Sequence, residues 1–213
     1  MNHPTILIAD DHDIVVDGLR GLLQSEFDVV GSVSDGRDVD GFVTRLKPDV
    51  VILDVSMPSL NGLDCARHLR SVGFPGRILI LTMHSDATMA EEALVAGANG
   101  FIVKTAPASE LRAALHQILL GQTYLSSAVA ENLAHLPGRA DSARKDTRCQ
   151  LTARQREVLQ LLAEGKSHKE VAVTLNISVK TAEFHKYAIF GTLGIRTNAG
   201  LVQYAIRHGI IGP

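Results

Sequence analysis

Polar residues follow or end four apolar segments in the first half of the sequence, where a hydrophobic core would continue. They are Asp10 and Asp11 after ILIA, Asp54 in VVILD, Thr82 in ILILT and Lys104 after GFIV. Carboxylate oxygens are the ligands that Mg²⁺ prefers, and an amine and a hydroxyl can bind phosphate oxygens. A carboxylate can also act as a nucleophile and form an aspartyl phosphate. Together these groups predict a site for a cation and a phosphoryl group.

Short apolar runs bounded by turn residues are typical of strands that are buried on both faces of a parallel sheet. We expect such strands at Thr5–Ala9, Asp28–Val33, Val50–Leu53, Arg77–Leu81 and Gly100–Val103. The amphipathic segments between them predict helices at Ile14–Gln24, Val39–Leu46, Leu63–Ser71, Ala87–Ala96 and Ser109–Leu120. Five βα units predict an α/β fold with a doubly wound five-stranded parallel sheet. Ligands bind at the carboxyl ends of such strands, where the polar residues would meet.

Each of these polar residues also has an ordinary interpretation when it is taken alone. An aspartate after a strand, such as Asp11 or Asp13, often caps the next helix. Thr82 alone is more often a turn residue, and Lys104 alone a solvated surface charge. Their joint position at successive strand ends favours the phosphoryl site over these separate interpretations.

The two halves of the sequence carry opposite net charge. Residues 1–136 hold 9 Lys and Arg against 17 Asp and Glu, whereas residues 137–213 hold 12 against 6. This asymmetry indicates that the second half binds a polyanion, although uneven surface charge alone would also produce it. The only cysteines, Cys65 and Cys149, lack the spacing of a zinc finger or a disulfide framework. No apolar run is long enough to span a membrane, so we expect a cytoplasmic protein.

The second half of the sequence predicts an exposed linker followed by a small all-helical domain. A short helix at Ser126–His135 precedes the polar stretch PGRADSARKDTRCQ. Thr152 and Gln155 then form a possible capping box at the start of the next helix. Further helices are expected at Lys169–Leu175, Val179–Leu193 and Ala199–His208. The predicted boundaries are residues 1–122, a linker with a short helix at 123–150, and residues 151–213.

The short NIS turn makes two of these helices cross steeply, as in a helix-turn-helix whose second helix enters the major groove of DNA. A positively charged helical hairpin can also be a protein-binding module. If the partner is DNA, lysines and hydroxyls suit phosphates, and Glu183, Phe184 and Tyr187 suit base edges. The DNA-binding candidates on this helix are Lys180, Thr181, Glu183, Phe184, His185, Lys186 and Tyr187.

The first 120 or so residues resemble the receiver domain of two-component response regulators, which has a flavodoxin-like fold. The acidic pair, the motif DVSMPSLNG around Asp54, Thr82 and Lys104 carry this resemblance. It implies that Asp54 is the phosphoacceptor, that Thr82 and Lys104 bind the phosphate, and that Phe101 is the switch aromatic. It also implies Mg²⁺ as the cofactor, held by Asp10, Asp11, Asp54 and the backbone carbonyl of Ser56.

The residues from 151 onward resemble the LuxR-type DNA-binding domain, through LTARQREVLQLLAEGKSHKEVAVTLNIS, KTAEFH and LGI. The whole sequence therefore resembles response regulators of the NarL/LuxR (FixJ-type) family. The resemblance implies a phosphorylation-controlled transcription regulator and not an enzyme. Its expected partners are a sensor histidine kinase, double-stranded DNA and a second copy of the chain, the homodimer forming on phosphorylation or DNA binding.

Two other functions compete with this interpretation. A phosphatase with an aspartate nucleophile would use the same cation and lysine, but it resembles a family with a second acid where Ser56 stands. An output that binds RNA or protein is the other alternative, and the low aromatic content of 4% disfavours base stacking on single strands. Thr192 departs from the LuxR pattern, which commonly has a charged residue there, so we expect weaker nonspecific DNA affinity.

Overall fold

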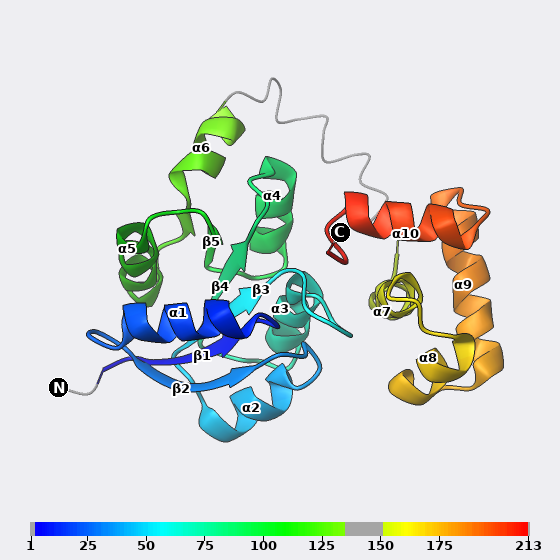
Figure 1. Cartoon of the computed structure of the whole chain (residues 1–213), viewed down its shortest axis with the longest axis horizontal. Helices are drawn as coiled ribbons and strands as arrows, with labels where there is room; N and C mark the ends of the chain where they lie inside the picture. The colour runs from blue at the N-terminus through cyan, green and yellow to red at the C-terminus, as the bar shows by residue number, and fades with distance from the viewer. Residues whose placement is uncertain (1–2, 135–150, 213) are drawn as a thin grey trace. The chain divides into compact units, whose positions relative to one another are not determined.

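The computed structural model describes residues 3–134 and 151–212, which form two compact units that follow each other in the sequence (Figure 1). The predicted linker PGRADSARKDTRCQ lies outside the described residues. Among the described helices, none combines the length and apolarity that a bilayer span requires.

The first unit is built on a parallel sheet with strand order β2-β1-β3-β4-β5-β6 (Figure 1). The first five strands confirm the predicted fold class and its doubly wound order. Their apolar side chains are almost all buried in β1, β3, β4 and β5, because helices cover both faces of the sheet. The strands are β1 (Thr5–Ala9), β2 (Asp28–Val33), β3 (Val50–Asp54), β4 (Arg77–Thr82), β5 (Gly100–Val103) and β6 (Tyr124–Leu125).

Two hydrophobic clusters fix the helices to opposite faces of the sheet. Helices α1 (Asp13–Leu23) and α5 (Ala108–Leu119) pack on one face, around a cluster that includes Phe27. Helices α2 (Val39–Leu46), α3 (Gly62–Ser71) and α4 (Ala87–Val95) pack on the other, around a cluster that includes Phe101. The ends of the five predicted helices agree with these to within about one residue.

The sequence interpretation missed strand β6. This strand has only two residues, which is too short for a hydrophobic pattern to reveal it. It pairs with β5, and it leads directly into helix α6 (Ser127–Ala134), which packs against α4. Val129 of α6 is completely buried in the same cluster as Phe101. The chain that leaves the receiver-like sheet is therefore packed against the sheet edge before residue 135.

Glycine is required at the start of α3 because the backbone of β3 comes very close. A Cβ atom on Gly62 would lie 2.1 Å from the carbonyl oxygen of Asp54. The amide of Gly62 also donates to the carbonyl of Val55 at 3.0 Å. The loop that follows Asp54 is thus pinned against the end of its own strand, which fixes the position of the Asp54 side chain.

The second unit consists of four short helices around a core that includes Leu161, Val171 and Ile189. The predicted capping box of Thr152 and Gln155 is present, and Ser167 and Glu170 form a second one that the sequence interpretation missed. The helices are α7 (Ala153–Ala163), α8 (His168–Leu175), α9 (Val179–Leu193) and α10 (Asn198–Arg207).

The turn between α8 and α9 has the geometry of a helix-turn-helix. Asn176 adopts a left-handed conformation at φ 50°, which ends α8 abruptly, and Ser178 caps α9 by accepting the amide of Thr181. Only two residues lie between Asn176, the C-cap of α8, and Val179, the first residue of α9. Helix α9 must therefore leave at a steep angle to α8. The predicted helix-turn-helix is therefore confirmed.

We expect Gly62→Ala to destabilise the first unit by about 1–3 kcal/mol, because its Cβ would collide with backbone that cannot move away like a side chain. Gly18→Ala is the matched control: a Cβ there meets nothing within 4 Å, and alanine favours the interior of α1 by about 0.5–1 kcal/mol. Urea unfolding of both variants tests this. Equal effects of the two substitutions would contradict the close approach.

Candidate functional site

Asp10 and Asp54 lie side by side at the carboxyl edge of the sheet. Asp10 immediately follows β1, Asp54 is the last residue of β3, and β1 and β3 are hydrogen-bonded neighbours. The chain runs from β1 to β2 on one side and to β3 on the other, so this is the point where the strand order reverses, a place where such sheets bind ligands. Both carboxylates are 97% buried.

Lys104 bridges the two buried carboxylates. Its Nζ lies 2.7 Å from Oδ2 of Asp10 and 3.2 Å from Oδ1 of Asp54, and its side chain is only 10% exposed. The residue is fixed by its backbone as well, since its amide donates to the carbonyl of Thr82 at 2.6 Å. The structure therefore brings Asp10, Asp54 and Lys104 together, with Thr82 at the end of the strand beside β3.

The ionised form of the Asp54 carboxyl is energetically unfavourable in its buried position. Burial raises the pKa of the Asp54 carboxyl, the ion pair with Lys104 lowers this pKa in part, and the Asp10 and Asp11 carboxylates raise it again. The net direction is upward from the ordinary value of 3.8. A second positive charge at this place would relieve the cost, because it would stabilise the ionised form of Asp54.

His12 belongs to this cluster, and the sequence interpretation missed it. Its Nδ1 lies 2.8 Å from an oxygen of Asp11 and 3.2 Å from Oδ1 of Asp10, which also accepts the His12 amide. His12 is the residue before helix α1, and neither it nor Asp11 caps that helix with its side chain. The alternative that Asp11 is merely a helix cap is therefore wrong.

The donor set suits a hard divalent cation. Ligand atoms of Asp10, Asp11, His12 and Asp54 all lie within 4.8 Å of one another. Three carboxylates are the kind of ligand by which Mg²⁺ is held in proteins, with water in the remaining positions. Ser56 is half-buried in the loop two residues beyond Asp54, and its carbonyl as a ligand stays a prediction.

Thr82 and Phe101 connect the site to the interior of the unit. The Thr82 hydroxyl oxygen accepts the amide of His84 at 3.2 Å, and it lies 4.0 Å from the sulfur of Met89 in α4, to which it can donate weakly. Phe101 is completely buried, and its backbone carbonyl accepts the amide of Ser126 at 2.9 Å. The Thr82 hydroxyl therefore contacts α4, and Phe101 is hydrogen-bonded to Ser126, the residue that precedes α6.

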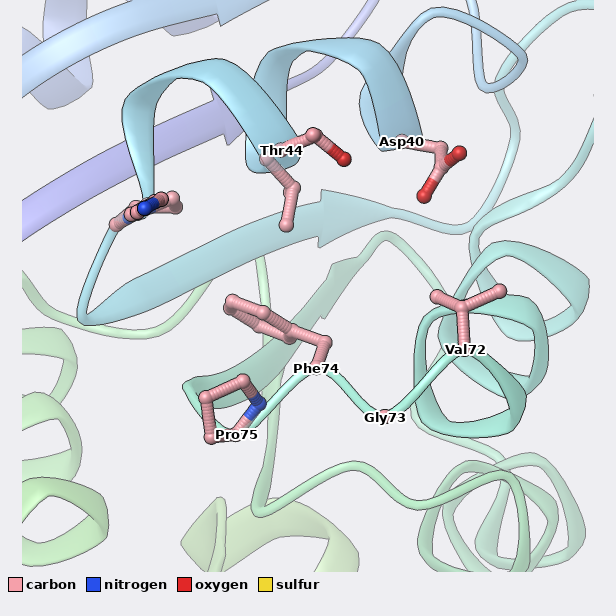
Figure 2. A pocket seen from close by; sticks show the side chains of 9 residues that line it. Asp40, Thr44, Val72, Gly73, Phe74 and Pro75 are labelled. Carbon is pink, nitrogen blue, oxygen red and sulfur yellow. The ribbon is translucent and has the colours of Figure 1, made fainter.

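Two cavities lie near the sheet, at opposite ends of its strands. A cavity of about 440 Å³ between α1 and α5 includes Lys104 and Met83 in its lining, so it adjoins the acidic site. Another of about 400 Å³ lies between α2 and the loop before β4, and Figure 2 shows Asp40 and Thr44 facing Phe74 and Pro75 across it. This second cavity is at the amino ends of the strands, away from the acidic site.

The seven predicted DNA-binding residues of helix α9 fall into two groups that differ in solvent exposure. Lys180, Glu183, Phe184 and Tyr187 are exposed and recur at intervals of three or four residues, so they share one face of the helix. The other three are half-buried: Thr181, His185 and Lys186. The exposed group has the wider access to a groove, and the roles of all seven residues stay predictions.

Comparison with known families matches both units. Residues 6–116 match the model of the response regulator receiver domain, and residues 149–205 match that of bacterial regulatory proteins of the luxR family. The two matches follow each other in the order that the sequence predicts.

Individual relatives match the chain over almost its whole length. The transcriptional regulatory protein MctR of Rhizobium johnstonii is 34% identical over 97% of this chain and 94% of its own. The oxygen regulatory protein NreC of Staphylococcus aureus is 35% identical over 97% and 98%. A structure of the response regulator RcsB from Salmonella typhimurium matches with a TM-score of 0.67 at 29% identity, covering 96% of this chain and 97% of that one. A structure of an RcsB–DNA complex matches with a TM-score of 0.60 at 28% identity, covering 95% and 98%.

We expect Asp54→Asn to stabilise the protein at neutral pH when no divalent cation is present. The raised pKa means that the folded state binds the Asp54 proton more tightly than the unfolded state, so ionised Asp54 costs stability above that pKa. The difference in melting temperature between variant and wild type should shrink as the pH falls through the raised pKa towards 3.8. Added Mg²⁺ should stabilise the wild type more than the variant. A variant that is less stable at every pH would contradict the burial cost.

Proposed function

The chain belongs to the response regulators that join a receiver domain to a LuxR-family DNA-binding domain, and from this premise we propose how its residues carry out that function. The protein is a DNA-binding transcription regulator controlled by phosphorylation. Its receiver pairs with a sensor histidine kinase, and its helical domain binds double-stranded DNA as a dimer. The proposed boundaries are residues 1–122 for the receiver, 123–150 for the connecting segment and 151–213 for the DNA-binding domain.

We assign the phosphoacceptor to Asp54, and the contact that carries this assignment is the ion pair between Lys104 and Asp54. An oxygen of Asp54 attacks the phosphorus of the kinase phosphohistidine, and the bond from phosphorus to the imidazole nitrogen breaks. Lys104 is already in contact with Asp54 and can neutralise charge on the incoming phosphoryl oxygens. Mg²⁺, held by Asp10, Asp11, Asp54 and the Ser56 carbonyl, supplies further positive charge when bound.

The readout begins at the Thr82 hydroxyl. This hydroxyl contacts the sulfur of Met89, and a thioether is a weak acceptor. An anionic phosphoryl oxygen on Asp54 is a much stronger acceptor, so the Thr82 hydroxyl turns from α4 towards the phosphate. Phe101 then moves into the space left behind. The affected surface is that of α4, β5 and α5, together with α6, which packs against α4.

The competing function, a phosphatase that turns over an external substrate, has less support. Asp54 has Ser56 two residues later, and a hydroxyl or a backbone carbonyl cannot act as the second acid that such a reaction needs. We therefore propose that the protein is not an enzyme and that it acts in the cytoplasm, where histidine kinases and the chromosome are accessible.

Phosphorylation with and without Asp54 tests the assignment. Acetyl phosphate and Mg²⁺ should add one phosphoryl group to the wild type, seen by intact mass, and none to Asp54→Asn. Footprinting on duplex DNA should then show phosphate-dependent protection for the wild type only. Labelling of Asp54→Asn at the wild-type level would move the acceptor elsewhere. Equal protection by both proteins would reject the switch and leave DNA binding in place.

Thr192 offers a second test, of the DNA-binding face alone. The residue is exposed near the end of α9, where a lysine would reach a phosphate if this helix lies in the groove. We expect Thr192→Lys to steepen the slope of log affinity against log salt by about one unit and to tighten nonspecific binding. Thr192→Gln controls for side-chain length without charge. An unchanged slope would mean that position 192 faces away from the phosphates.

A further inference from the structure

The exposed face of α9 carries an unusual combination of two aromatic rings and a carboxylate. Phe184 and Tyr187 are each 69% exposed, and the Glu183 side chain is 48% exposed. Ala182 and Ile189, on the opposite side of the helix, are completely buried in the core of the domain. The face therefore contributes little to the stability of its own domain, and most of each ring is open to a partner, with Phe184 edge-on to the His185 ring at 5.9 Å.

The charges around these rings favour a nucleic acid partner over a protein one. Lys180 is exposed one turn before Phe184, and Lys186 lies half-buried on the adjoining face of α9, with its Nζ 5.4 Å from the ring centre of Phe190. The segment from residue 137 onward has twice as many basic as acidic residues. Duplex DNA satisfies both features, because phosphates attract the lysines while the floor of the major groove presents apolar methyl groups.

Glu183 restricts which bases can lie opposite the face. A carboxylate only accepts hydrogen bonds, and phosphates repel it, so it is tolerated only where it faces a donor on a base edge. In the major groove cytosine presents the N4 amino donor, whereas adenine places the N7 acceptor beside its amino group and guanine presents two acceptors. Nδ1 of His168 in α8 lies 3.7 Å from the Glu183 carboxylate and limits its orientations.

Resting on the DNA-binding function proposed above, we propose that α9 reads pyrimidine edges. Phe184 packs on the 5-methyl group of a thymine, and Glu183 accepts a hydrogen bond from the N4 amino group of a cytosine. Because the two residues are adjacent in α9, the thymine and the cytosine occupy neighbouring base pairs of each operator half-site. Tyr187, one turn further along, extends the apolar contact.

The first experiment removes single methyl groups from the DNA. Operator sequences are selected from a random duplex library with full-length protein treated with acetyl phosphate and Mg²⁺. In the best sequence, each thymine is then replaced in turn by deoxyuridine, which lacks only the 5-methyl group. We expect one replacement per half-site to weaken binding about fourfold, the effect of burying one methyl group.

Variants of the protein show which residue makes that contact. The deoxyuridine effect should disappear in Phe184→Ala and persist in Phe184→Leu, which keeps an apolar side chain. Val173→Ala is the matched control, because Val173 is an exposed apolar residue of α8 outside this face, and it should retain the full effect. Circular dichroism checks that all three variants fold.

A second experiment tests the carboxylate. Replacing the neighbouring cytosine pair by a thymine pair should cost the wild type about tenfold or more. Glu183→Gln should lose this discrimination and shift the preference towards adenine, to which an amide can form two hydrogen bonds.

The outcomes separate this proposal from the function on which it rests. Failure of the phosphorylated wild type to bind any duplex would overturn both. Sequence-specific binding that no deoxyuridine weakens, or that weakens equally in Phe184→Ala, would overturn the thymine contact and leave the DNA-binding function intact. Unchanged base preference in Glu183→Gln would overturn the cytosine contact, and would indicate that Glu183 serves only to hold His168.

Discussion

The ion pair of Lys104 with the buried carboxylates of Asp10 and Asp54 is the interaction on which the receiver site depends. Two anions with little solvent access would repel each other, and the single ammonium group between them offsets that repulsion. Burial raises the Asp54 pKa, and Lys104 offsets this only in part because the Asp10 and Asp11 carboxylates raise that pKa as well. The site is therefore short of positive charge, and this deficit is the physical reason why a divalent cation would suit it.

Strand β5 leads directly to the Lys104 ammonium group, and it also pairs with β6, through which the chain continues. Lys104 directly follows β5, Phe101 lies within β5, and Phe101 is paired with Leu125 of β6 and bonded to Ser126. The Thr82 hydroxyl, which would bind a phosphoryl group, contacts Met89 of α4, and α6 packs against α4. A rearrangement at Thr82 and Phe101 would therefore reach α6 through α4 and through Ser126, the residue that precedes α6.

The sequence predicted the fold well because buried strands and capped helices leave local signals. Five strands, the helix order and the acidic site all followed from apolar runs and the polar residues that end them. Strand β6 was missed because two residues carry no pattern, and its pairing depends on an edge that exists only after folding. His12 was missed because its role comes from two distances in space, whereas its sequence position alone suggested nothing beyond the start of a helix.

The face of the DNA-binding helix that is exposed was also not predictable from the sequence. Sequence reasoning divided the seven residues of α9 by chemistry between phosphates and base edges, but only the burial of Ala182 and Ile189 reveals which side of the helix faces inward. Once that side is known, the helical repeat leaves one exposed face. The chemistry of Glu183 and Phe184 on this face then indicates which bases they could contact. A carboxylate beside an exposed ring is poorly suited to the phosphate backbone, since neither group attracts an anion. On the exposed face they suit a surface with both a donor and a methyl group, and in duplex DNA the edges of pyrimidines in the major groove offer these groups.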